Sequence, residues 1–156
     1  MPLDIYTDGG CSGNPGPGGW AWVMVQKTFQ GDTILAEAAG SEQGTTNNRM
    51  ELLAVISSLK AFRVMRGGVS RRATVHTDSQ YVQKGITEWI LAWKRNSWRT
   101  SSKQPVKNQD LWMELDALAQ ELSPEWEWVK GHAGNRYNEY CDRLTREEVK
   151  KILPKS

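Results

Sequence analysis

The chain has 156 residues, of which 38% are hydrophobic and 24% charged, a composition typical of one globular domain with its own core. The length leaves little room for a second domain, so we expect a single domain over residues 1–156. Lys and Arg total 20 against 18 Asp and Glu, and the resulting net charge of +2 excludes a strong overall attraction to anionic partners.

The two cysteines, Cys11 and Cys141, are too few for a disulfide-stabilised scaffold, and we expect both to be free thiols. The sequence shows no signal peptide and no apolar run of membrane length. We therefore expect a cytoplasmic protein with no membrane partner, and a monomer.

The first part of the chain predicts three antiparallel strands. Residues 3–8 alternate in polarity and end at a glycine-rich turn, residues 9–19, whose two prolines should exclude regular strand pairing. Residues 20–26 and 33–40 are the next two strands and form a hairpin.

A helix should follow, beginning after Thr46 and ending at Gly67, because its apolar residues recur on one stripe. Residues 72–77 then predict a short strand. Residues 80–84 begin a helix that Gly85 should interrupt, with helical character resuming at residues 89–93.

The last part of the chain predicts a helix with leucines at helical spacing, residues 111–122, between Pro105 and Pro124. A strand over residues 126–129 and a terminal helix over residues 138–151 with a basic end complete the series. This order predicts an α/β fold: a mixed five-stranded sheet, three antiparallel strands then two parallel ones, flanked by helices.

Two acids end predicted parallel strands in similar contexts, Asp8 in YTDG and Asp78 in HTDS. Because ligands gather at the carboxyl ends of strands in such sheets, these side chains are candidates for a site. A carboxylate at a strand end can also be a turn former or a helix cap. Glu51 borders the apolar stripe of its helix, and Asp142 opens the terminal helix, where it could instead be a first-turn acid favoured by the helix dipole.

Acids that converge without neutralising bases repel one another, and divalent cations make such a cluster tolerable. An all-oxygen ligand set with no Cys/His pattern suits Mg²⁺ or Mn²⁺ rather than zinc. Two such ions can activate a water and stabilise the leaving oxygen of a phosphodiester. If the four acids meet, they therefore predict metal-dependent phosphodiester chemistry.

Five cations and no acid lie between residues 94 and 107, in a segment that also contains tryptophan: Lys94, Arg95, Arg99, Lys103 and Lys107. Such interleaving favours contacts with a nucleic-acid backbone beside aromatic surfaces. The tryptophans can equally be packing residues.

Four blocks of the sequence resemble the signatures of type 1 ribonucleases H. They are TDGGCSGNPGPGG at residues 7–19, TTNNRMEL at 45–52, TDSQYV at 77–82, and WEWVKGHAG at 126–134 leading to NEYCD at 138–142. The resemblance runs from residue 3 to about residue 144, and it implies the ribonuclease H-like sheet, a two-metal endonuclease, and cleavage of the RNA strand of an RNA–DNA hybrid that leaves 5′-phosphate and 3′-hydroxyl ends.

The resemblance also assigns roles to individual residues. It implies that two Mg²⁺ ions, or Mn²⁺, are held by Asp8, Glu51, Asp78 and Asp142. It matches His132 to a loop histidine whose near-neutral pKa suits proton transfer or product release. Contacts to the hybrid's minor groove are implied for Asn14, Asn47, Asn48 and Gln80, with Cys11 beside them, since amides can both donate to and accept from a 2′-hydroxyl. Thr46 is a candidate contact to a phosphate.

From sequence alone, purely structural roles also remain open for these residues. Asn14 can be a turn residue, Asn47 and Asn48 helix-start residues, and Thr46 a helix cap. Residues 89–105 resemble a basic protrusion that grips substrate, which adds Trp89, Lys94, Arg95 and Arg99 to the expected contacts.

Two other classes of function compete with this interpretation. An integrase, transposase or resolvase would also place acids on a similar sheet, and a non-catalytic hybrid-binding module would be expected to have lost an acid. Asn47, Asn48, Gln80 and the His132 loop favour the hybrid nuclease. The chain departs from the family pattern after Asp142, where LTREE replaces an alanine-rich run.

Overall fold

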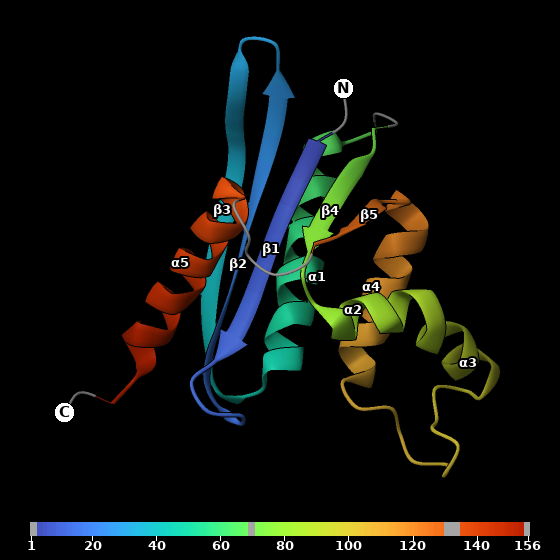
Figure 1. Ribbon diagram of the computed structural model, residues 1–156. Coiled ribbons are helices and arrows are strands. Elements are labelled where there is room, and N and C mark those ends of the chain that lie inside the picture. Colours follow the sequence, from blue (N-terminus) through green and yellow to red (C-terminus); the bar gives the residue numbers. More distant parts are fainter. Residues whose placement is uncertain (1–2, 69–70, 130–134, 155–156) are drawn as a thin grey trace.

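The computed structural model describes residues 3–68, 71–129 and 135–154 (Figure 1). Its sheet has five strands in the order β3-β2-β1-β4-β5. They are β1 (Leu3–Cys11), β2 (Gly16–Thr28), β3 (Gly31–Thr45), β4 (Ala73–Thr77) and β5 (Glu125–Trp128). The pairs β1–β2 and β2–β3 are antiparallel, whereas β4 runs parallel to β1 and β5 parallel to β4. The predicted mixed sheet is therefore confirmed.

The helices lie on both faces of this sheet (Figure 1). They are α1 (Asn47–Arg66), α2 (Gln80–Lys84), the π-helical turn η1 (Gly85–Trp89), α3 (Ile90–Arg95), α4 (Gln109–Leu122) and α5 (Arg136–Ile152). The helix α1 packs on β1, β2 and α4, and α5 packs on β1, β2 and β3. Within the described residues, no helix is long and apolar enough to cross a membrane.

Alternation along β1 and β2 divides the core between the two faces. Ile5 and Met24 belong to the larger cluster under α1 and α4, whereas Tyr6 and Val23 face α5. Successive strand residues point to opposite faces, so each strand contributes to both clusters. Cys11 and Cys141 are free thiols, as predicted.

The glycine-rich turn is shorter than predicted. Strand β1 continues to Cys11 and β2 begins at Gly16, with Gly10 paired to Gly19. A register shift between Gly16 and Gly18 accommodates Pro17, whose carbonyl accepts from the Ser12 amide at 2.8 Å. The prolines therefore do not prevent strand pairing. The bulge takes Pro17, which has no amide proton, out of the regular hydrogen-bond pattern.

We predicted that Gly85 would interrupt the helix, and this prediction is wrong. The chain passes from α2 through η1 into α3 with helical backbone throughout, and only the hydrogen-bond spacing widens. A Cβ atom at Gly85 would lie 2.0 Å from the ring of Trp112. The glycine therefore lets this helix approach α4 closely rather than ending it.

The terminal helix begins at Arg136, two residues earlier than predicted, and Asn135 caps it by accepting from the amides of Tyr137 and Asn138. The acid of its first turn is Glu139. The alternative that Asp142 is a first-turn acid is therefore wrong.

Candidate active site

Asp8 and Asp78 lie at the same edge of the sheet. The parallel register pairs Tyr6 of β1 with His76 of β4, and each acid lies two residues beyond that pair. Strand β1 extends past Asp8, which pairs with Ala21 of β2, whereas Asp78 directly follows β4. The carboxyl end of the parallel pairing therefore brings both acids to one place.

A close crossing of α1 over β1 places Glu51. A Cβ atom at Gly9 would lie 2.5 Å from the carbonyl carbon of Met50 and 2.6 Å from the amide nitrogen of Glu51. Only glycine permits this approach, and it brings the start of α1 directly over the residue that follows Asp8.

The Glu51 side chain is half-buried and accepts a short hydrogen bond from the Ser79 hydroxyl. Burial raises the pKa of Glu51, the Ser79 hydrogen bond opposes this rise, and the nearby charge of Asp78 adds to it. The Asp78 carboxylate therefore lies near enough for its charge to act on Glu51.

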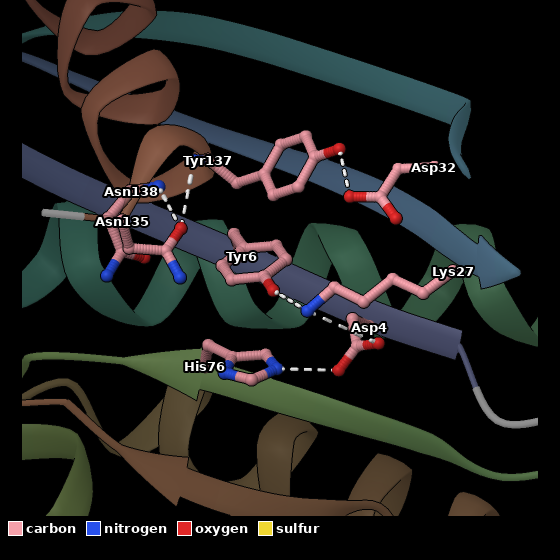
Figure 2. Close-up of polar contacts among 8 residues, drawn as sticks. All are labelled: Asp4, Tyr6, Lys27, Asp32, His76, Asn135, Tyr137 and Asn138. Carbon is pink, nitrogen blue, oxygen red and sulfur yellow. Dashed lines mark hydrogen bonds and ion pairs between the residues drawn. The ribbon is translucent and has the colours of Figure 1, made fainter. Parts of the chain in front are cut away.

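The docking of α5 on β1 places Asp142. The buried Tyr6 stacks on His76 with ring centroids 4.3 Å apart, and its ring lies 5.1 Å from that of Tyr137. The Tyr137 hydroxyl donates to Asp32 at 2.8 Å (Figure 2). The Cys141 thiol donates to the Tyr6 carbonyl at 3.4 Å. These contacts fix the helix against the strand that carries Asp8.

A network of polar side chains also contacts Tyr6. Lys27 donates to the Tyr6 hydroxyl at 2.6 Å and lies 3.9 Å from Asp4, whose carboxylate meets His76 at 2.7 Å (Figure 2). The network joins β1, β2 and β4. Asp4 and His76 are half-buried, where a paired polar contact helps to hold the strands in register.

Asp8 and Asp142 line one cavity of about 380 Å³ between β1 and α5. Arg146, one turn further along α5, forms a 3.0 Å ion pair with Asp142. Asp78 thus lies near Glu51, and Asp8 shares a cavity with Asp142. No three His, Cys, Asp or Glu side chains among residues 3–68, 71–129 and 135–154 form a ready-made metal cluster. His132 lies outside the described residues.

The predicted substrate contacts at the turn and at the start of α1 are linked by hydrogen bonds. The Cys11 amide donates to the Asn47 side chain at 2.8 Å, and the Asn47 amide donates to the Asn14 side chain at 3.2 Å. Thr46 is the helix cap that its position allowed, accepting from the Arg49 amide at 3.2 Å. These residues therefore have structural roles, and Asn14 and Asn48 are also exposed.

A groove of about 770 Å³ separates these residues from the basic segment. Asn14, Thr46 and Asn48 line one side. The other side includes residues that sequence reasoning missed: Tyr81, Thr100, Ser102, Gln104 and Asn108. The polar run between the cations at residues 99 and 107 was the available signal for most of them. Cys11 does not line this groove, and its thiol donates to the Thr45 carbonyl at 3.3 Å.

The cations of the basic segment have two kinds of environment. One is held in an ion pair, and three others line a hollow. Lys94 forms a 2.8 Å ion pair with Asp116, which ties α3 to α4. Arg95, Arg99 and Lys103 line a separate hollow of about 370 Å³ on the protrusion.

The tryptophans of the basic segment, Trp89, Trp93 and Trp98, contact one another in series and pack against the larger core cluster. Their packing interpretation is therefore supported. Trp93 also borders the groove, whereas Gln80 is exposed at the start of α2.

Comparison with known proteins gives consistent matches. A family model described as RNase H matches residues 2–150. The chain is 54% identical to a ribonuclease H of Treponema denticola, over 98% of this chain and all of that protein. It is 53% identical to a ribonuclease H of Dinoroseobacter shibae, over 99% of this chain and 96% of that one.

Among solved structures, LC9-RNase H1, described as a type 1 RNase H with the type 2 active-site motif, matches with a TM-score of 0.82. It is 31% identical, and the match covers 97% of this chain and 73% of that chain. The sheet order and these matches define a nuclease with the ribonuclease H fold. The chain belongs to the type 1 ribonuclease H family, as the sequence blocks predicted, and is an enzyme of that family.

Proposed function

We propose that this enzyme hydrolyses the RNA strand of RNA–DNA hybrids with two divalent cations, leaving 5′-phosphate and 3′-hydroxyl ends. The observation that carries the proposal is the placement of Glu51. A close crossing of α1 over Gly9 holds this half-buried acid beside Asp78, at the carboxyl edge of β4. Family membership over residues 2–150 supports the same reaction.

The acids at this edge fit a divalent cation. Their donors are carboxylate oxygens, which Mg²⁺ and Mn²⁺ prefer. Burial raises the pKa of Glu51 and the charge of Asp78 adds to the rise; a bound cation would offset the repulsion between these two carboxylates. Asp8, Glu51, Asp78 and Asp142 would hold the ions. When bound, the ions supply an activated water and stabilise charge on the leaving oxygen.

Other residues of the chain bind and orient the hybrid. The groove beside Asn14, Thr46 and Asn48 offers amides and hydroxyls that can donate to or accept from ribose hydroxyls. Arg95 and Arg99 on the protrusion supply charge for phosphates beyond the groove. We propose a monomer in the cytoplasm, with the hybrid as its partner.

Cleavage of strand-labelled substrates tests the proposal. RNA–DNA hybrid, duplex DNA and duplex RNA of one sequence are incubated with Mg²⁺, with Mn²⁺ and with chelator. We expect only the RNA strand of the hybrid to be cut, and only with metal. Cleavage of duplex DNA would favour an integrase-type or resolvase-type nuclease, and hybrid binding without any cleavage would favour a non-catalytic module.

The basic segment gives a prediction about salt dependence. Replacing Arg95 and Arg99 with alanine should weaken hybrid binding and flatten the slope of log K against log salt by up to about 1.8, or about 0.9 for each lost phosphate contact. The matched control is Lys60→Ala with Arg63→Ala, which removes the same charge from cations paired with Glu114 and Glu121. Equal slopes in the two double variants would show that the protrusion does not contact phosphate.

His132 gives a prediction that separates proton transfer from metal binding. His132→Ala should lower turnover by roughly 10²-fold or less, at or below the lower end of what a positioned general acid or base contributes, because His132 assists rather than holds metal; metal affinity should stay the same. Turnover at saturating hybrid and calorimetric titration with Mn²⁺ measure the two quantities. A loss of metal affinity would show that His132 is a ligand instead.

A further inference from the structure

Ser79 lies between the metal-site acid Asp78 and the first turn of α2, and its side chain is buried. Its hydroxyl makes two hydrogen bonds of opposite direction. It accepts from the Val82 amide at 3.0 Å, which caps α2, and it donates to the Glu51 carboxylate. The Ser79 amide is held in turn by the Thr77 hydroxyl at 3.1 Å.

This arrangement fixes where the hydroxyl proton points. A serine hydroxyl has one proton, and an amide such as that of Val82 can only donate to it. Because the Val82 bond uses an acceptor position, the single proton is free to point at Glu51. A donor aimed at a carboxylate favours its charged form and restricts its orientation.

The hydrogen bond also links two elements that carry different acids. Glu51 belongs to α1, whereas Ser79 directly follows Asp78 at the end of β4. We infer that Ser79 is a positioning residue that holds the Glu51 carboxylate beside Asp78, so that this pair is ready to receive a divalent cation. The inference rests on the proposed metal-dependent function.

The alternative is that Ser79 only caps α2. Loss of a cap lowers the free energy of unfolding but leaves metal affinity unchanged. Loss of a positioning hydrogen bond lowers metal affinity, typically about tenfold or more for a residue that supports a metal ligand. The two roles therefore differ in a measurable quantity other than activity.

The experiment uses the full chain with Ser79→Ala, Ser79→Thr and Ser79→Cys. Calorimetric titration with Mn²⁺ in the absence of hybrid should show about tenfold weaker binding for Ser79→Ala. Ser79→Thr should restore wild-type affinity, because it keeps the hydroxyl. Ser79→Cys should stay weak, because a thiol fills the space but is a poor donor. In cleavage assays Ser79→Ala should lower kcat at subsaturating Mn²⁺ with KM for the hybrid unchanged.

Glu51→Ala supplies the background that isolates the hydrogen bond, because alanine has no acceptor for the Ser79 hydroxyl. If Ser79 acts through the Glu51 carboxylate, adding Ser79→Ala to Glu51→Ala should change Mn²⁺ affinity by less than twofold. Urea unfolding should show a loss of stability from Ser79→Ala in both backgrounds, because the cap is lost in both. Wild-type Mn²⁺ affinity in Ser79→Ala or Ser79→Cys would overturn the inference. Failure of the wild-type chain to bind Mn²⁺ or cut hybrid would instead overturn the proposed function.

Discussion

Asp78→Asn is expected to abolish cleavage of the RNA strand while leaving hybrid binding intact. Asp78 directly follows β4, the strand next to the central strand β1. Burial raises the pKa of the nearby Glu51, and the charge of Asp78 adds to this rise. Asparagine keeps the size and shape of the side chain but removes that charge. A neutral carbonyl balances a divalent cation less well than a carboxylate, so occupancy of the metal site should fall together with turnover.

Hybrid affinity in Asp78→Asn should be unchanged or slightly higher, because the groove and the protrusion are untouched and one negative charge near the phosphates has gone. Cleavage in saturating Mg²⁺ and hybrid affinity in chelator are measured on the same preparation. Glu127→Gln on the neighbouring strand β5 is the control, since it makes the same chemical change at an exposed position. Near-normal cleavage by Asp78→Asn would remove Asp78 from the metal site.

Gly9→Ala is expected to destabilise the fold severely and to displace Glu51. The added Cβ would lie 2.5 Å from the carbonyl carbon of Met50 and 2.6 Å from the Glu51 amide nitrogen. Both are backbone atoms of α1, so no side-chain rotation can relieve the contact. Overpacking of a core commonly lowers the free energy of unfolding by 1–3 kcal/mol, and we expect about 3 kcal/mol or more here.

Urea unfolding of Gly9→Ala and Gly10→Ala separates close packing from the mere loss of a glycine. At Gly10 the nearest atom to an added Cβ is the Asn47 side-chain oxygen at 3.9 Å, an ordinary contact. The two glycines are adjacent on β1, so they share a sheet environment. Similar unfolding free energies for the two variants would contradict the close crossing of α1 over β1, and with it the placement of Glu51.

The fold could be predicted from sequence because each strand and helix shows its own periodicity. Alternation at residues 3–8 and the apolar stripe of the helix after Thr46 identified β1 and α1. Boundaries were less certain where tertiary contacts decide them. The start of β2 at Gly16 depends on a bulge, and the continuity of helix at Gly85 depends on Trp112, which is distant in sequence.

The site could be predicted only as a set of residues at one sheet edge. Strand order implied that Asp8 and Asp78 would lie at the same end of the parallel strands, and the register between Tyr6 and His76 places them there. Their meeting in one metal site stays a prediction. Sequence alone could not show that Glu51 accepts a hydrogen bond from Ser79, because that contact depends on how α1 crosses β1. It also could not show that Lys94 pairs with Asp116 across two helices.

The four acids remain a predicted metal site, and the ion pair between Asp142 and Arg146 adds a condition to it. A cation at Asp142 must compete with the Arg146 guanidinium, which is largely exposed and can move away into solvent. The LTREE segment after Asp142, which departs from the family pattern, therefore bears directly on the site. This segment contains Arg146, whose positive charge competes with a metal ion for Asp142.

Anomalous diffraction from crystals of the wild-type chain with Mn²⁺ and a non-cleavable hybrid is the most direct test of the central claim. We expect two anomalous peaks, from two Mn²⁺ ions bound by Asp8, Glu51, Asp78 and Asp142 and facing a phosphate of the RNA strand. Mn²⁺ peaks at other residues, or a DNA strand at the four acids, would contradict it.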